Sequence, residues 1–372
     1  MSDTCCEACL RHSHLVAHLA PRIAGILGRR GPAPGGVLTL GERELVERVA
    51  GERVEETMGF VERFEPGHAR EALSAADVFG LCRHSPSYPG GVRLLPDPPK
   101  VLYCTGSPER LSDLTAEPAA TIVGSRRASP YGLEAARELG RGLAAAGLTV
   151  VSGLALGIDA AAHRGALAAS GQVIAVLACG PDIAYPASHR SLYRQIRERG
   201  IVMSEMPPGT RALRWGFPAR NRIMAALGAI TVVVEAGDPS GSLITASFAS
   251  DLGKTVGAVP GRVTSEVAAG SNRLLRDGAA VIRCAEDVLD EIFGIGNHPP
   301  APELDAGDQP PPALTPELRE VLRQVGDGKS VGEIALATRI PVAAVRAALG
   351  RLEHEGLIVA GSLGVYERAA GR

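Results

Sequence analysis

Short apolar runs alternate with amphipathic stretches along the middle of the chain, between Lys100 and Phe293. Seven runs rich in Val, Ile and Ala have the length and composition of strands that are covered on both faces. We predict strands over 119–123, 148–152, 173–178, 201–204, 230–235, 255–259 and 280–283. The segments between them predict helices over 131–146, 160–169, 188–199, 219–227, 243–252 and 273–276. Alternation of this length is typical of an α/β fold with a doubly wound parallel sheet.

The two flanking regions have different patterns. Residues 1–98 predict helices over 11–27, 42–49 and 69–79, followed by a proline-rich connector. Residues 295–313 contain six prolines and two glycines, which favours a semi-rigid linker. Beyond it, Ser330 and Glu333 form a capping box, Pro341 starts a longer helix, and 357–367 predicts a β-hairpin. We therefore predict a helical N-terminal region (1–98), a Rossmann-like domain (99–294), a linker (295–313) and a winged-helix domain (314–372).

Composition narrows the function classes. The 372 residues are 45% apolar and 22% charged, as in an ordinary soluble globular protein, and the net charge is −2. Any site for a polyanion must therefore be local. No apolar run has the length of a membrane span, and the first residues lack a basic region followed by an apolar one, so we expect no membrane association and a cytoplasmic location. Seven cysteines in so long a chain do not indicate a disulfide framework.

The segment Thr121-Ile-Val-Gly-Ser-Arg-Arg-Ala-Ser-Pro-Tyr-Gly132 joins the first predicted central strand to a helix. Ser129 and Pro130 are typical of an N-cap and a first helical position. The segment therefore brings backbone N–H groups, a helix N-terminus and the guanidinium groups of Arg126 and Arg127 to one point. This combination favours a phosphate group, of a nucleotide or of a nucleic acid.

Other loops should meet this segment, because ligands of such sheets bind beyond the carboxyl ends of the strands. Arg220 and Arg222 flank Asn221 near a predicted helix start, where positive charge opposes the helix dipole, so we expect an anion nearby. Phe217 could provide a surface for base stacking, or could equally pack in the core. We interpret Asp159 as an N-cap and His163 as structural. The candidate nucleic-acid-binding residues are Gly124, Ser125, Arg126, Arg127, Gly153, Gly157, Arg214, Phe217, Arg220, Asn221, Arg222, Ser240, Gly241 and Ser242.

Known catalytic motifs are missing from the sequence. It has no Gly-x-x-x-x-Gly-Lys-Ser/Thr loop, no Gly-x-Gly-x-x-Gly after the first central strand and no Gly-x-Ser-x-Gly elbow. We therefore expect a binding surface rather than an enzyme, with no cofactor.

The run from Thr121 to Ile292 resembles the DNA-processing protein A (DprA, or Smf) family. The matching motifs are Ile122-Val-Gly-Ser-Arg-Arg, Ser152-Gly-Leu-Ala-Leu-Gly-Ile-Asp-Ala-Ala-Ala-His, Phe217-Pro-Ala-Arg-Asn-Arg-Ile, Val234-Glu-Ala, Ser240-Gly-Ser-Leu-Ile-Thr-Ala and Ser271-Asn-Arg-Leu-Leu-Arg-Asp-Gly-Ala. The resemblance implies a homodimer that binds and protects single-stranded DNA during natural transformation, loads a RecA-type recombinase onto it and is not known for catalysis. It also implies that Gly124, Ser125 and Arg126 grip phosphate and that Arg214 and Phe217 match a basic and an aromatic position. Asp238 and Glu266 are departures that would oppose DNA if they face the groove.

Two other functions compete with this one. Similar Rossmann-like domains include phosphoribohydrolases with a Pro-Gly-Gly-x-Gly-Thr-x-x-Glu loop, and the loop Pro239-Ser-Gly-Ser-Leu-Ile-Thr-Ala lacks both the glycine pair and the acid. A module that senses a free nucleotide stays open, since a phosphate loop would hold either ligand.

Two features outside the central domain bear on partners. Residues 314–372 carry eight basic and seven acidic side chains, so we expect an accessory role for this domain with modest DNA affinity. Near the start of the chain, Cys6-Glu-Ala-Cys9 could join Cys82 and His84 in a tetrahedral zinc site. Because Cys82-Arg-His84 lacks the usual spacing of two residues between ligands, we expect ordinary thiols and no metal, with zinc as the alternative.

Overall fold

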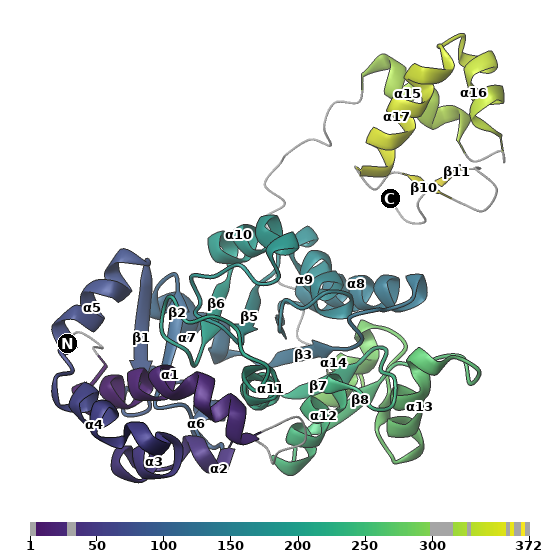
Figure 1. Cartoon of the computed structure of the whole chain (residues 1–372). Coiled ribbons are helices and arrows are strands. Elements are labelled where there is room, and N and C mark those ends of the chain that lie inside the picture. Colours follow the sequence, from purple (N-terminus) through teal and green to yellow (C-terminus); the bar gives the residue numbers. More distant parts are fainter. Residues whose placement is uncertain are drawn as a thin grey trace. The chain divides into compact units, whose positions relative to one another are not determined.

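The computed structural model describes residues 5–27, 35–297, 315–325, 329–354, 358–360 and 366–368. The chain divides into two compact units, Met1–Pro302 and Glu303–Arg372 (Figure 1). Most of the predicted linker, from 298 to 313, lies outside the described residues. No helix in the described ranges has both the length and the apolar character needed to cross a bilayer.

A nine-stranded sheet organises the first unit, in the order β1-β2-β6-β5-β4-β3-β7-β8-β9. All neighbours from β6 to β9 pair in parallel, whereas β1–β2 and β2–β6 pair antiparallel. All seven predicted strands are present, so a mostly parallel α/β sheet is confirmed. The strands are β1 (Val78–Cys82), β2 (Val101–Thr105), β3 (Ala119–Val123), β4 (Thr149–Ser152), β5 (Val173–Leu177), β6 (Ile201–Ser204), β7 (Ile230–Val233), β8 (Thr255–Ala258) and β9 (Ala280–Val281).

The helix predicted over 69–79 is wrong beyond Ala75. Asp77 adopts a left-handed conformation (φ 53°) that breaks the helix, and the chain then enters β1. The five residues of β1 pair in register with β2, from Val78 opposite Thr105 to Cys82 opposite Val101. Pairing with a segment about 25 positions away overrode the local helical preference of this stretch. The hydrophobic periodicity of the sequence is a local signal and does not report such a pairing.

Helices cover both faces of the sheet, because successive strand residues point to opposite sides. Val173, Ala175 and Leu177 of β5 pack with one helix layer, and Ile174 and Val176 pack with the other. The first layer contains α8 (Pro130–Ala145), α9 (Ile158–Ala168), α10 (Arg190–Arg199) and α14 (Ala285–Phe293). The second contains α6 (Gly90–Arg93), α7 (Pro108–Ala116), α11 (Gly216–Leu227) and α12 (Gly241–Asp251), and α13 (Ala269–Arg276) adds the partly buried Leu274.

The N-terminal helices pack on the segment that precedes α11. Leu15, Leu19 and Ile23 of the first helix share a cluster with Trp215 and Met206. The Trp215 Nε1–H group donates to the Ala20 carbonyl at 3.0 Å, which fixes the indole against that helix. The predicted helices at 11–27 and 42–49 are confirmed. The elements are α1 (Glu7–Leu27), α2 (Gly35–Leu38), α3 (Glu42–Val49), α4 (Val54–Glu62) and α5 (Pro66–Ala75).

The second unit has its own apolar core, in which Val321, Ile334, Val345 and Leu349 are fully buried. It contains α15 (Pro316–Gln324), α16 (Val331–Thr338), α17 (Val342–His354), β10 (Ile358–Ala360) and β11 (Tyr366–Arg368). The capping box of Ser330 and Glu333 is confirmed, and β10 and β11 pair antiparallel. Part of the predicted hairpin, including 361–365, lies outside the described residues, and the winged-helix assignment stays a prediction.

Candidate functional site

A cleft of about 650 Å³ opens at the carboxyl ends of β3 and β7. These strands are neighbours in the sheet, but the chain leaves β3 for β4 on its other side, so the cleft lies at a topological switch point. Ten of the fourteen candidate residues line it: Gly124, Ser125, Arg126, Arg127, Phe217, Arg220, Asn221, Ser240, Gly241 and Ser242.

The loop after β3 lies tightly against its neighbours. A Cβ atom on Gly124 would lie 2.6 Å from Ile158 Cγ1 and 2.8 Å from the Glu235 carbonyl oxygen, so only glycine fits. The Ser125 N–H group donates to that same Glu235 oxygen at 2.6 Å, and the Ser125 carbonyl accepts from Ile158 N at 3.2 Å. The loop is thereby fixed, and the side chains of Arg126 and Arg127 are left exposed at the cleft.

The start of α8 is occupied by a carboxylate of the protein itself. Glu235 follows β7, and its two carboxylate oxygens accept from Ser129 N (2.8 Å) and Ser129 Oγ (2.6 Å). The sequence interpretation that this helix start offers free N–H groups to a phosphate is therefore wrong at Ser129. Sequence reasoning missed Glu235, although an acid directly after a central strand and near a helix start was the available signal.

The start of α12 is built differently. Ser240 caps the helix by accepting from Ser242 N at 3.4 Å, and the two serine Oγ atoms lie 2.8 Å apart. Asn221 Nδ2 donates to the Gly241 carbonyl at 3.1 Å and holds this turn against α11. One turn along, Thr245 lines the cleft with a buried hydroxyl that has no hydrogen-bond partner among the described residues. The hydroxyl groups of Ser240 and Ser242 and a positive helix end thus lie at the cleft, which favours an anion.

An aromatic side chain and a guanidinium group stack at the cleft. Arg126 Cζ lies 4.8 Å from the centroid of the half-buried Phe217 ring. The Tyr185 ring lies 5.7 Å from Phe217, tilted by 50°, and is 43% exposed. Phe217 is therefore not a core residue, and Tyr185 is a neighbour that sequence reasoning missed. Its only sequence signal was an aromatic residue in a loop between β5 and α10.

Arg220 lines the cleft but turns its guanidinium group inward. It is 6% exposed, donates to the Gly153 carbonyl at 2.5 Å and to the Val176 carbonyl, and lies 3.7 Å from Asp159 Oδ2. Burial lowers the pKa of Arg220, which Asp159 partly offsets. A Cβ atom on Gly153 would lie 2.0 Å from Arg220 Nη1. The expectation of an exposed phosphate contact is therefore corrected, since Gly153 makes room for an internal arginine.

Arg222 lies outside the cleft altogether. It is 2% exposed, and its Nη1 and Nη2 atoms donate to Glu205 at 2.9 and 2.8 Å while Nε lies 3.0 Å from Asp97 Oδ2. The sequence analysis predicted an anionic ligand near Arg222. The structure corrects this, because two carboxylates of the same chain neutralise it.

Two further candidate residues lie outside the cleft, and two acidic residues line it. Arg214 is exposed but does not line the cleft. Gly157 also lies outside the lining. Its φ is 79°, and a Cβ atom there would lie 2.2 Å from the Ser125 carbonyl oxygen, so glycine lets Ser125 approach α9. The acidic departures do face the cleft, because Asp238 and Glu266 both line it. Asp238 is paired with Arg273, which reduces its repulsion of an anion.

The cleft has the features of an anion-binding site in a Rossmann-like protein: a glycine-shaped loop after β3, exposed arginines and a hydroxyl-lined helix start. Residues 80–293, more than half of the chain, match the family model described as DNA recombination-mediator protein A. The chain belongs to this family, and the resemblance seen in its motifs is confirmed.

Individual relatives agree. A putative DNA processing protein DprA of Mycobacterium tuberculosis is 45% identical over 266 residues, covering 70% of this chain and 66% of the relative, just under two thirds of its length. Protein Smf of Synechocystis is 32% identical over 349 residues, covering 86% of this chain and 87% of the relative. The X-ray structure of DNA processing protein A from Streptococcus pneumoniae has a TM-score of 0.62 at 30% identity and covers 76% of this chain and 96% of that one.

Proposed function

We propose that this chain binds and protects single-stranded DNA in the cleft and loads a RecA-type recombinase onto it during natural transformation or DNA uptake. The observation that carries the proposal is the stack of Arg126 on Phe217 beside the open start of α12. An aromatic face binds an unpaired base of any sequence, and the neighbouring guanidinium and hydroxyl groups bind the phosphates on either side.

Electrostatics support a strand that follows one path through the cleft. The net charge of the chain is −2, so attraction for a polyanion must come from a local arrangement. Arg126 and Arg127 supply exposed positive charge on one side, and the α12 start supplies a helix dipole on the other. Glu266 lines the cleft as well, and we propose that the phosphates stay clear of it.

The choice of single-stranded over duplex DNA follows from the aromatic side chains. Bases inside a duplex are stacked on one another and cannot place a face on Phe217, whereas a single strand can. The family description, recombination mediator, supports a nucleic acid as the ligand and a recombinase as the partner. We further propose a cytoplasmic homodimer without catalytic activity, in which a winged-helix unit at 314–372 has an accessory role beside the Rossmann-like domain.

Fluorescence polarisation with single-stranded and duplex oligonucleotides of one sequence, over a salt series, tests this function. We expect tighter binding of the single strand, with log K falling linearly with log salt at a slope of about −0.7 per phosphate contacted. A nucleoside monophosphate competitor should displace the strand poorly. Equal binding of duplex, or displacement by the mononucleotide at concentrations near those of the strand, would contradict the proposal and favour a nucleotide-binding role.

A further inference from the structure

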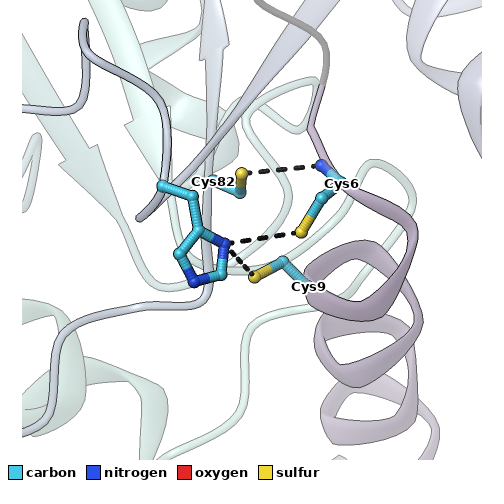
Figure 2. A group of neighbouring side chains, drawn as sticks. Cys6, Cys9 and Cys82 are labelled. Carbon is cyan, nitrogen blue, oxygen red and sulfur yellow. Dashed lines mark hydrogen bonds between the residues drawn. The ribbon is translucent and has the colours of Figure 1, made fainter.

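Three cysteines and a histidine meet at the β1 edge of the sheet, away from the cleft. Cys6 precedes α1, Cys9 lies in its first turn, and Cys82 is the last residue of β1 (Figure 2). His84 lies two residues further. The four ligand atoms of these side chains all lie within 4.8 Å of one another, although more than 70 positions separate the two pairs in the sequence.

The separations fit a tetrahedral metal ion. A zinc ion bound at about 2.3 Å from sulfur and about 2.0 Å from nitrogen separates these two ligands by about 3.5 Å. His84 Nδ1 lies 3.5 Å from Cys6 Sγ and 3.5 Å from Cys9 Sγ. One imidazole nitrogen thus faces two thiols at the edge length of the coordination tetrahedron, and Cys82 closes the fourth corner.

A backbone N–H group and two basic side chains lie near the sulfur atoms. The Cys6 N–H group donates to Cys82 Sγ at 3.5 Å, and the N-terminal end of α1 favours negative charge on the sulfur atoms beside it. Arg83 and Lys100 lie close enough to interact electrostatically with Cys9. They would offset the single net negative charge that three thiolates and one divalent ion leave.

A neighbouring cysteine is distinguished by its contacts. Cys5 is buried and its Sγ donates to the Cys6 carbonyl at 3.7 Å, but Cys5 is not among the four residues whose ligand atoms lie within 4.8 Å of one another. Cys5, Cys6, Cys9 and Cys82 are all free thiols, so no disulfide competes for the ligands. Cys5 therefore gives a matched control, one residue from a ligand.

We propose that Cys6, Cys9, Cys82 and His84 bind one zinc ion in a structural site. Four protein ligands complete a tetrahedral shell and leave no position for a substrate, which is the pattern of a structural rather than a catalytic zinc. The ion would join the start of α1 to the end of β1. Through Trp215, which donates to Ala20 of α1, this attachment would also support the segment that precedes Phe217.

Metal analysis of the full chain, purified without chelator, is the first test. We expect about one zinc per chain, with Cys5→Ser retaining the metal and both Cys9→Ser and Cys82→Ser losing it. Protein that contains no stoichiometric zinc and takes up none when zinc is supplied under reducing conditions would overturn the proposal. Zinc retained in equal amount by Cys9→Ser, Cys82→Ser and wild type would also overturn it.

Cobalt substitution of the wild-type chain tests the ligand set without relying on a variant that folds. We expect the visible bands of tetrahedral cobalt together with sulfur-to-cobalt charge transfer, and His84→Cys should keep a tetrahedral site whereas His84→Ala should weaken it. Chelator should lower the melting temperature of wild type and leave that of Cys9→Ser unchanged. Octahedral cobalt spectra, or an equal response of both proteins to chelator, would count against the site.

Discussion

The carboxylate of Glu235, just beyond β7, accepts two hydrogen bonds from Ser129 at the start of α8, at 2.8 Å from its N–H and 2.6 Å from its hydroxyl group. A helix start that the sequence assigns to a phosphate ligand is thus capped from within. The groups that the cleft offers to an anion are therefore the loop 124–127 and the start of α12, and Phe217 lines the same cleft.

Replacing Arg126 with alanine should weaken binding of single-stranded DNA similarly for all sequences. Arg126 is exposed at the cleft, so its loss should remove one phosphate contact and reduce the salt slope by about 0.7. Fluorescence polarisation over a salt series measures both quantities. Arg137→Ala is the matched control, because Arg137 is exposed on α8 outside the cleft. Unchanged affinity and slope in folded Arg126→Ala would remove this residue from the interface.

Replacing Phe217 with alanine should weaken single-strand binding by about 1–3 kcal/mol, the usual value of one base stacked on an aromatic ring. Phe217→Trp should bind at least as well as wild type, since it keeps an aromatic face. Equilibrium titration at a fixed salt concentration compares the three proteins. If alanine and tryptophan variants bind alike, the ring serves packing and not stacking.

Replacing Arg222 with alanine should destabilise the fold by about 3–5 kcal/mol, because it leaves the half-buried carboxylates of Asp97 and Glu205 without their positive partner. Urea denaturation measures the change. Arg214→Ala removes an exposed arginine from the same stretch of chain, and its stability should stay within about 0.5 kcal/mol of wild type. A small effect at Arg222 would argue that its charge is available to a ligand after all.

The free energy of unfolding should decrease as the pH is lowered, in part because of His163. Burial, and then the charge of Arg220, lower the pKa of this fully buried histidine to about 3, whereas an unfolded chain has a value of about 6.5. Between these two pKa values His163 is protonated in the unfolded state and neutral in the folded state. The free energy of unfolding therefore decreases as pH falls from about 6.5 towards 3.

Urea denaturation at pH 7.5 and at pH 5 checks this. Wild type should lose more stability between the two than His163→Leu does, and His68→Leu, at an exposed position, should behave as wild type. Parallel losses in wild type and His163→Leu would show that other groups cause the acid sensitivity.

Ending the chain at residue 297 should leave single-strand binding within about tenfold of that of the full chain, or about 1.4 kcal/mol. The cleft lies wholly within the first compact unit. In the removed part, Arg346 and Arg351 of α17 are balanced by Glu353 and Glu355 nearby in the sequence, so this unit offers little net attraction for DNA. A larger loss would place it in the principal site.

The sequence predicted the central fold well, because its signals are local. Each parallel strand is an apolar run such as Ile230–Val233, bounded by glycine and polar residues. The two antiparallel strands, β1 and β2, were missed for two reasons. The segment that forms β1 directly follows a helical pattern, and only the conformation of Asp77 separates the two. The segment that forms β2 follows a proline-rich connector, whose sequence predicts irregular structure. Their place in the sheet depends on pairing with β6 and with each other.

The candidate site was likewise predicted only in part from the sequence. Residue type and position in the loops were enough to predict that Gly124, Arg126, Phe217 and Ser240 lie at one edge of the sheet, because the carboxyl ends of parallel strands meet there. The direction of each side chain was not determined locally. Arg220, Arg222 and Glu235 come from the same loops and helix starts, yet each is neutralised or bound by a group distant in sequence. Whether a charge meets solvent or an internal partner is decided by packing, since burial penalises any charge that finds no partner.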